Sequence, residues 1–589
     1  MLPSMPTSKN ASEEAQLENT ETLESTDTQS VWPTSPATSK PATVEPADES
    51  QPAAHQPVKH RSVTYKSQPK SSLNKSQPAT RIPAPRITEK PKTKNLKIKN
   101  LKTEQHKLEQ PKTEKPKTEK LKTEKPKTDE VWPETAPEPK WQEGEIIKLA
   151  ITDLSNTGDG VGRWENRVVF VPNTVPGDEM RVKLTKVKAT HGFGIPAGIV
   201  TASPDRVRPA CIVADKCGGC QWQAVSYEAQ LAAKHRLVTD ALARIGKMED
   251  VAVDPVMAAE RQLNYRNKAT YPVVKSQIKT VKAGYYRRGS HTVVNLNQCP
   301  VQDERLDPLL AEVKQDIQDR EWKIYDEHHH KGHIKHLSLR VGQRTGQILL
   351  TLVSRSVKLK GIHEQAQQWL ERYPNVVGVL VNLNWQKTNA IFGPETYPIA
   401  GKSYLEEEFA GLTFQIQPTT FFQVNTTQAE RLLAEVQREL ALTGEEVIVD
   451  AYCGVGTFTL PLAKQAKHCI GLESFTASVT QAEKNAAQNG IENVSFVIGD
   501  VGATLPNVEM LPDIVMMDPP RKGCEPDVLE ALRAMKPPRI VYISCNPATL
   551  ARDLKALCED GAYRIARIQP ADFFPQTSHV ECAAFLVAS

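Results

Sequence analysis

The chain has 589 residues, 39% of them hydrophobic, and a net charge of +4. This length exceeds what one hydrophobic core serves, so several domains are expected. No apolar run is long enough to cross a bilayer, and the N-terminus lacks the basic-then-apolar pattern of a secretory signal. Ten cysteines in such a chain are typical of a reducing compartment, so we expect a cytoplasmic protein with no membrane partner.

Residues 1–140 are rich in Ser, Thr, Pro, Glu and Lys and poor in large apolar residues. Such a segment cannot bury enough surface to offset its ordering entropy, so it is predicted to be a disordered charged tail. Within it, residues 59–127 carry 21 Lys or Arg against 6 Asp or Glu, and residues 111–130 repeat a PKTEK-like unit. The prolines favour an extended spacer. It either adds affinity for a polyanion or serves only solubility.

Residues 141–203 contain short alternating apolar runs separated by Gly-rich turns at 158–160 and 176–178. Strands of this length and spacing predict a small barrel of the OB type. The segment resembles a TRAM domain, an RNA-binding barrel attached to RNA-modifying enzymes, although other small barrels share the pattern.

Residues 204–410 mix helical and strand periodicity and predict a central α/β domain. The predicted helices are 308–319 and 361–371, and the predicted strands are 336–342, 347–353 and 376–382.

The same region holds a cysteine cluster. Cys211, Cys217 and Cys220 lie close together in sequence, and Cys299 precedes Pro300. Four thiolates could hold zinc or a 4Fe–4S cluster. Zinc ribbons usually pair two CxxC knuckles, and here the fourth cysteine stands alone.

Residues 411–589 alternate between apolar strands and helices, which predicts a parallel, doubly wound sheet. The strands are 446–450, 468–472, 494–498, 513–517 and 539–543, and the helices are 458–466, 476–489, 525–535 and 548–558. In such a sheet the site lies beyond the carboxyl ends of the strands.

The first of these strands ends at Asp450 and runs into Gly454-Val455-Gly456, a loop typical of nucleotide binding. Glu473 ends the next strand, where an acid suits a pair of ribose hydroxyls. Position 459 is Thr, where a dinucleotide fold favours Gly or Ala. The loop therefore favours a mononucleoside cofactor such as S-adenosylmethionine (SAM), while another ligand of a Rossmann-like domain stays open.

Two later strands deliver Asp518-Pro519-Pro520-Arg521 and Cys545 to the same edge of the sheet. A helix begins near Ala548, and its dipole is expected to lower the pKa of Cys545 and favour a thiolate. Cys545 is thus a candidate nucleophile. The remaining cysteines of this region are expected to be spectators: Cys453, Cys469, Cys524, Cys558 and Cys582.

Five segments together resemble the RNA uracil-5-methyltransferase family, whose SAM-dependent members make 5-methyluridine in tRNA or 23S rRNA. They are FFQVN (421–425), DAYCGVGTFTLPLA (450–463), DPPRKG (518–523), SCNPATLARDL (544–554) and HVE (579–581). The resemblance implies a C-terminal Rossmann-like methyltransferase domain at 411–589 with Cys545 as nucleophile and Glu581 as base. It implies a SAM site lined by Gln423, Tyr452, Glu473, Asp500 and Asp518.

The resemblance also implies a 4Fe–4S cluster on Cys211, Cys217, Cys220 and Cys299, with zinc as the lesser alternative. The TRAM-like barrel and the four cysteines together favour 23S rRNA over tRNA as the substrate. We expect the protein to act as a monomer.

Two other hypotheses remain open from the residues. An amino-methyltransferase would use Asp518-Pro519-Pro520 to hold an exocyclic amine, but such sites typically have an aromatic residue where this chain has Arg521. A non-catalytic iron–sulfur RNA-binding factor would have no use for an intact Cys545 and Glu581.

Overall fold

The structure is a computed structural model that describes residues 140–589. The predicted charged tail and its repeats therefore lie outside the described residues.

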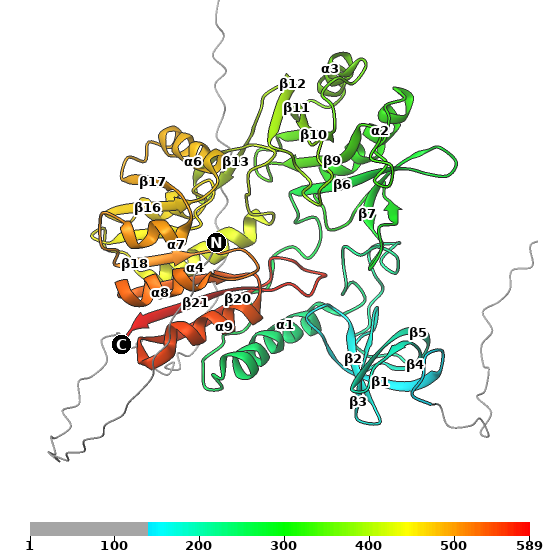
Figure 1. Cartoon of the computed structure of the whole chain (residues 1–589), viewed down its shortest axis with the longest axis horizontal. Coiled ribbons are helices and arrows are strands. Elements are labelled where there is room, and N and C mark those ends of the chain that lie inside the picture. The colour runs from blue at the N-terminus through cyan, green and yellow to red at the C-terminus, as the bar shows by residue number, and fades with distance from the viewer. Residues whose placement is uncertain (1–139) are drawn as a thin grey trace, which may run out of the picture. The chain divides into compact units, whose positions relative to one another are not determined.

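The first element is a closed five-stranded barrel with the strand order β1-β2-β3-β5-β4 (Figure 1). Its strands are β1 (Ile146–Leu154), β2 (Gly160–Trp164), β3 (Arg167–Val171), β4 (Glu179–Val187) and β5 (His191–Thr201). Alternate residues such as Ile147, Leu149 and Val182 point inward and are buried, because side chains along a strand alternate between its faces. The predicted barrel is confirmed.

The central region forms a seven-stranded sheet with the order β12-β11-β10-β9-β6-β7-β8. Its strands are β6 (Lys268–Lys275), β7 (Val281–Tyr286), β8 (Val293–Asn295), β9 (Ile334–Val341), β10 (Ile348–Ser354), β11 (Val376–Leu383) and β12 (Glu395–Gly401). Helices α2 (Asp307–Asp319) and α3 (Ile362–Arg372) share one hydrophobic core with this sheet. The elements predicted here are present, and β6, β7, β8 and β12 are additional strands.

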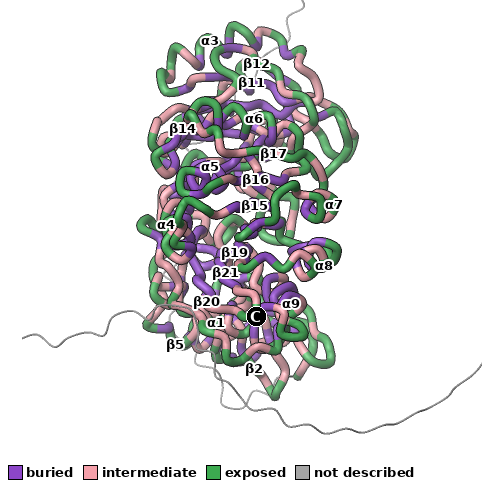
Figure 2. Tube along the Cα trace, turned by 90° about the vertical axis from the view of Figure 1, so that its left-hand side faces the viewer, coloured by how far each residue is buried: buried purple, intermediate pink, exposed green. Residues whose placement is uncertain are grey.

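The C-terminal region forms a second seven-stranded sheet with the order β17-β16-β15-β18-β19-β21-β20. Its strands are β15 (Val447–Ala451), β16 (His468–Glu473), β17 (Val494–Ile498), β18 (Ile514–Met517), β19 (Arg539–Ser544), β20 (Tyr563–Ala571) and β21 (Glu581–Ala588). Its helices are α4 (Thr426–Leu440), α5 (Thr459–Ala463), α6 (Thr476–Gln488), α7 (Val501–Thr504), α8 (Pro526–Met535) and α9 (Pro547–Cys558). Figure 2 shows that the inner strands of this sheet are buried along most of their length.

Two expectations about this sheet need correction. The first five strands are parallel as predicted, but β21 pairs antiparallel with β19, and β20 antiparallel with β21, so the sheet is mixed. The helix predicted at 458–466 is only α5, because residues 464–467 already form the turn that leads into β16.

Segments from earlier in the chain complete the C-terminal core. Helix α1 (Tyr227–Ala241) and the π-helical turn η1 (Leu242–Gly246) pack against α9. The hairpin of β13 (Leu405–Phe409) and β14 (Leu412–Ile416) packs on the opposite face of the C-terminal sheet.

The remaining short elements are three 3₁₀ turns, η2 (Glu304–Leu306), η3 (Leu505–Asn507) and η4 (Glu559–Gly561). Among residues 140–589, no helix combines the length and apolar character needed to cross a lipid bilayer.

Candidate active site

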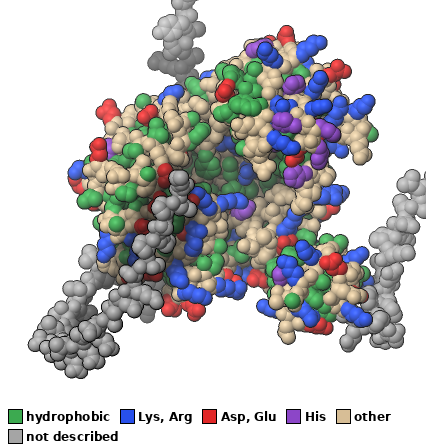
Figure 3. All heavy atoms as spheres, viewed as in Figure 1, with side chains coloured by type: hydrophobic (Ala, Val, Ile, Leu, Met, Phe, Trp, Pro, Cys, Tyr) green, Lys and Arg blue, Asp and Glu red, His purple; other side chains and the backbone are tan. Residues whose placement is uncertain are grey.

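A cavity of about 880 Å³ opens where the carboxyl ends of β15, β16, β18 and β19 face the cysteine-bearing part of the central region. Figure 3 shows a hollow on this face, with hydrophobic side chains on its walls and Lys and Arg atoms near its rim. The cavity collects every site residue predicted from the sequence. These are Cys211, Cys217, Cys220, Cys299, Gln423, Tyr452, Glu473, Asp500, Asp518, Cys545 and Glu581.

The loop after β15 shapes the end of the cavity nearest the sheet. Tyr452 adopts a positive φ of 68°, a conformation that is uncommon for a residue with a side chain and concentrates at functional sites. The Glu473 carboxylate accepts backbone N–H groups from Gly454 (3.2 Å) and Phe475 (2.8 Å). Asp500 caps α7 by accepting the Gly502 N–H at 3.0 Å. Carboxylates fixed at the ends of neighbouring strands suit the hydroxyl and amino donors of a nucleoside.

Asp518 lies directly after β18, deeper in the cavity. Gln423 Nε2 donates to Asp518 Oδ2 at 3.4 Å, and burial raises the pKa of Asp518 to about 7. The Gln423 carbonyl accepts from Asn267 Nδ2 at 3.0 Å, which ties this residue to the start of β6. These groups, with Tyr452, Glu473 and Asp500, form a polar pocket whose carboxylates fit a nucleoside bearing a positively charged sulfur.

Strand pairing brings Cys545 and Glu581 together. β19 and β21 are antiparallel, and Ser544 is paired with Cys582. The next position along this register sets Cys545, just past the end of β19, opposite Glu581, the first residue of β21. A thiol and a carboxyl group therefore face the same cavity, 36 positions apart in sequence but adjacent in the sheet.

The expectation that Cys545 has a lowered pKa and is a thiolate is wrong. Burial, then the charges of Glu581 and Asp518, raises the pKa of Cys545 to about 11, although Arg521 acts in the opposite direction. Helix α9 does begin next to it, at Pro547 with Asn546 as its cap, but its dipole does not outweigh these effects. Burial and Asp518 likewise raise the pKa of Glu581 to about 8.

The cavity is also lined by residues that the sequence analysis did not assign, among them Arg521, Phe574 and His579. Arg521 Nη2 lies 3.3 Å from His579 Nε2, and the His579 ring packs edge-on against Phe574. Burial and Arg521 lower the pKa of His579 to about 4, so the neutral ring accepts the Arg521 hydrogen bond. Arg521 lies in the DPPRKG segment and His579 in the HVE segment, both of which the sequence analysis quoted. Membership of these segments was the sequence signal that could have identified the two residues.

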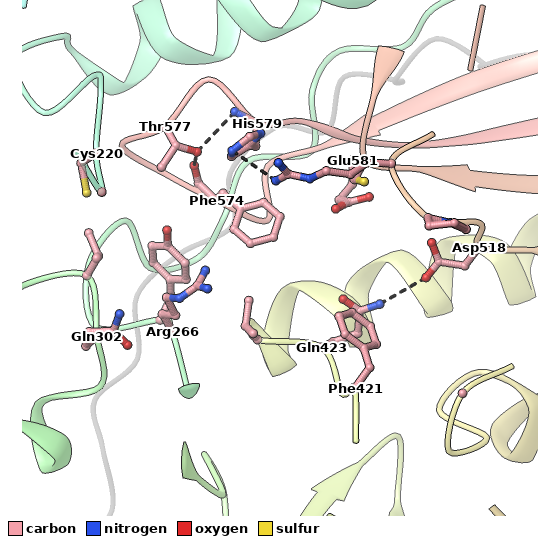
Figure 4. Close-up of a pocket in the computed structure, with 18 of the residues that line it drawn as sticks. Cys220, Arg266, Gln302, Phe421, Gln423, Asp518, Phe574, Thr577, His579 and Glu581 are labelled. Atoms are coloured by element: carbon pink, nitrogen blue, oxygen red, sulfur yellow. Dashed lines mark hydrogen bonds between the residues drawn. The ribbon is translucent and has the colours of Figure 1, made fainter. Parts of the chain in front are cut away.

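The other end of the cavity contains the four cysteines. In Figure 4, Cys220, Arg266 and Gln302 lie on one side of Phe574, and Gln423, Asp518 and Glu581 lie on the other. Burial, with a smaller contribution from neighbouring thiols, raises the pKa of Cys220 to about 11 and that of Cys299 to about 12. In the described part of the chain, no group of three or more His, Cys, Asp or Glu side chains is arranged to hold a metal ion.

Known proteins resemble this chain over most of its described length. Residues 226–500 and 507–589 match the tRNA (uracil-5-)-methyltransferase family, and residues 140–197 match the TRAM domain. An "uncharacterized RNA methyltransferase" of Nostoc sp. is 60% identical over 449 residues, which cover 76% of this chain and 98% of that protein. A second, from Synechocystis sp., is 51% identical and covers 77% of this chain and 98% of its own length.

Among solved structures, the chain is similar to the Pyrococcus abyssi tRNA (uracil-54, C5)-methyltransferase in complex with S-adenosyl-L-homocysteine. The two are 28% identical with a TM-score of 0.60, over 75% of this chain and all of that one. The family match extends over more than half of the chain and includes both the cofactor loop and Cys545. The chain therefore belongs to the tRNA (uracil-5-)-methyltransferase family of SAM-dependent RNA methyltransferases and carries a TRAM domain in addition.

Proposed function

We propose that this enzyme methylates carbon 5 of a uridine in RNA through a transient bond between Cys545 and the uracil ring. The observation that carries the proposal is the register of β19 and β21, which sets a thiol opposite a carboxyl group beside the cofactor pocket. A methyltransferase acting on an amino group has no use for such a pair.

The chemistry follows from the weakness of carbon 5 as a nucleophile. Addition of the Cys545 thiolate at carbon 6 converts the ring into an enolate, whose carbon 5 is electron-rich. SAM, when bound, supplies the electrophilic methyl group. Glu581 then removes the remaining proton from carbon 5, and the electron pair of that C–H bond restores the ring double bond as the sulfur leaves. The base must leave its stack to reach an enclosed site, so a flipped uridine is required.

Two RNA classes are candidates for the substrate. The combination of a TRAM domain with four clustered cysteines supports 23S rRNA. The second candidate, tRNA, is favoured by the name of the similar P. abyssi enzyme. Unmodified 23S rRNA and tRNA transcripts, incubated separately with methyl-labelled SAM and digested to nucleosides, decide between them. Label in 5-methyluridine supports the proposal, and label in adenosine or cytidine would indicate an amino-methyltransferase.

We also propose that Cys211, Cys217, Cys220 and Cys299 hold a 4Fe–4S cluster. All four line one cavity wall, and Gly218-Gly219 lets the chain turn tightly enough for the Gly219 N–H to reach the Cys217 sulfur at 3.4 Å. A single zinc ion would gather four sulfurs around one point. In a 4Fe–4S cluster each cysteine binds a different iron, and the lone Cys299 suits this better than the paired CxxC knuckles of a zinc ribbon.

This assignment predicts that anaerobically purified protein contains about four iron and four sulfide per chain. The Cys220→Ser variant is expected to lose most of both, because one of the four ligands is removed. Cys558→Ser, on α9 and outside the cavity, is the matched control and is expected to keep them. Zinc without sulfide in the wild-type protein would contradict the assignment.

The raised pKa of Cys545 predicts a strong pH dependence of adduct formation. With a pKa of about 11, the thiolate fraction rises about tenfold per pH unit between pH 7 and 9. The second-order rate of covalent trapping by 5-fluorouridine RNA is expected to rise with the same slope. Glu581 has a pKa of about 8, so Glu581→Gln removes a neighbouring negative charge above that pH and is expected to speed trapping there. A rate that is flat above pH 7 would contradict this, because it would require a thiol pKa lowered below about 7.

A further inference from the structure

The loop between β20 and β21 contains one residue in a strained conformation. Gln576 is buried and adopts a φ of 72°, in the left-handed region that residues with a side chain rarely occupy. Such a conformation persists only where the surrounding structure imposes it, and it is concentrated at functional sites. Gln576 stands five positions before Glu581 and does not line the cavity. The contacts that hold Gln576 in place therefore bear on where Glu581 lies.

Helix α1 holds Gln576 through a reciprocal pair of amides. Gln230 Oε1 accepts the Gln576 N–H at 2.9 Å, and Gln230 Nε2 donates to Gln576 Oε1 at 3.2 Å. Gln230 is buried, so water does not compete for these groups. The same Nε2 also lies within hydrogen-bond distance of the Trp222 and Val225 carbonyls, at 3.2 Å and 3.0 Å. Gln230 thus joins the loop to residues 222–225.

The segment that carries three of the cysteines, residues 211–222, contacts Gln576 directly and is called the cysteine segment below. Its last two residues, Gln221 and Trp222, both donate their backbone N–H to the Gln576 carbonyl, at 3.1 Å and 3.0 Å. They follow immediately after Cys220. The N–H, the carbonyl and the side-chain oxygen of Gln576 are thus all hydrogen-bonded, either to α1 or to the cysteine segment, and these bonds impose its φ.

The fourth cysteine is connected to the same loop through Tyr265. This side chain is buried and packs in one hydrophobic cluster with Cys299 and Cys220. Its hydroxyl donates to the Pro575 carbonyl at 3.0 Å. In Figure 4 the loop runs between Cys220 and Glu581. Two separate sets of contacts therefore connect the cysteines to the loop that ends at Glu581.

We propose that Gln230 and Gln576 form a latch between the cysteine segment and Glu581, so that the carboxyl group is set for proton removal only while the cysteine segment is held in place. This inference rests on the proposed function, which gives Glu581 the role of base and the cysteines a cluster. With a cluster bound, Cys217 and Cys220 restrain the cysteine segment, and the cysteine segment restrains Gln576. Neither Gln230 nor Gln576 lines the cavity, so both are positioning residues.

The first measurement separates ring addition from proton removal in the full chain. Covalent trapping by 5-fluorouridine RNA reports addition by Cys545, and decay of the methylated adduct on ordinary RNA reports removal of the proton by Glu581. Gln230→Met keeps the length of the side chain but removes its hydrogen bonds. It is expected to trap within about twofold of the wild-type rate and to release product about tenfold more slowly or worse, because a displaced base loses part of its catalytic contribution.

A second variant tests the latch with less disturbance of the fold. Glycine adopts a φ of 72° without strain, so Gln576→Gly removes the side-chain oxygen and leaves the backbone conformation accessible. It is expected to melt close to the wild-type temperature and still to release product slowly. Gln365 on α3 is also buried and lies outside the cavity, so Gln365→Met is the matched control and is expected to release product like wild type.

Hydrogen exchange measures the other end of the latch. The backbone N–H groups of Gln221 and Trp222 are protected by their bonds to Gln576. Gln230→Met is expected to speed the exchange of both by about 5- to 150-fold. Loss of iron to a chelator is expected to be faster in that variant, because coupling acts in both directions. Cys220→Ser, which lacks one cluster ligand, is expected to release product slowly with trapping preserved, and release at the wild-type rate would overturn the coupling to the cysteines.

The outcomes separate the latch from the proposed function. Product release, amide exchange and iron retention like wild type in Gln230→Met, in an enzyme that forms 5-methyluridine, would refute only the latch. Faster amide exchange in that variant, with no 5-methyluridine from wild type on either RNA class, would refute only the uracil methylation. Trapping and release slowed to the same extent would also overturn the latch, because they would indicate a general disturbance of the cavity rather than a displaced Glu581.

Discussion

Replacing Cys545 by alanine is expected to lower methyl transfer to RNA by about 10⁴-fold or more, because no other group in the cavity can activate carbon 5. SAM binding, measured by calorimetry, is expected to stay within about threefold of wild type. The Cys545 thiol lies just beyond the end of β19 and makes no hydrogen bond to the side chains of Gln423, Tyr452, Glu473, Asp500 or Asp518. A loss of turnover with cofactor binding preserved places the defect in the chemical step.

Covalent trapping sharpens this test. Wild-type enzyme is expected to form a denaturant-stable complex with 5-fluorouridine RNA, since fluorine at carbon 5 cannot leave as a cation. Cys545→Ala should form none, whereas Cys558→Ala on α9 should trap like wild type. Glu581→Gln should still add to the ring, and on ordinary RNA it should accumulate a methylated adduct, because only the final proton removal is blocked. Substantial methylation by Cys545→Ala would refute the adduct mechanism.

The second large effect is expected at a buried ion pair that positions the loop leading to Glu581. Lys234 on α1 and Asp572 after β20 are both fully buried, with Nζ 2.5 Å from Oδ1. Lys234 Nζ also donates to the Phe574 carbonyl at 3.1 Å, and Asp572 Oδ1 accepts the Phe574 N–H at 3.1 Å. The pair therefore fixes the start of the loop that carries Phe574 and His579 and ends at Glu581.

Lys234→Met would leave the Asp572 charge buried without its partner, which costs about 3–5 kcal/mol. We expect the Tm of this part of the protein to fall by roughly 6–15 °C. Desolvation lowers the pKa of Lys234 and the charge of Asp572 opposes this, as expected for a lysine that depends on its partner. Thermal unfolding followed by circular dichroism measures the shift.

A matched control and a rescue variant test the cause. Arg236→Ala, two residues along the same helix, removes a pair with Asp153 in which both side chains are roughly half-exposed, and is expected to cost less than about 1 kcal/mol. Lys234→Met combined with Asp572→Asn should regain part of the lost stability, because no uncompensated charge remains. Equal melting temperatures for Lys234→Met and Arg236→Ala would contradict this account of the loop.

The proposed catalytic pair, Cys545 and Glu581, shows what could and could not be predicted from the sequence. Cys545 was found from its place after an apolar strand and before a helix, and Glu581 only from a family motif. The strand β21 that carries Glu581 was not predicted, although it is apolar along most of its length. Its role depends on antiparallel pairing with β19 across 36 positions of sequence, and such long-range pairing leaves little trace in a local pattern.

The ionisation of Cys545 is a second case. From sequence, the only visible influence was the helix that follows, which favours a thiolate. The structure adds burial and two carboxyl groups, Asp518 from the loop after β18 and Glu581 from β21, and these raise the pKa instead. A pKa depends on the charges that surround a group in space, and those come from elements distant in the chain.

The sequence by itself determined the class of chemistry, since it placed a nucleotide loop, a thiol and an acidic-proline loop at the ends of strands of one sheet. It also determined the closed barrel, through alternating apolar runs separated by turns. Only the tertiary structure decided that all eleven predicted residues line one cavity, that α1 anchors the loop leading to Glu581 through Lys234, and that the same loop meets the cysteine segment at Gln576. Alternation and turn residues act between neighbours in the chain, whereas cavities, buried ion pairs and contacts between loops depend on which distant segments pack together.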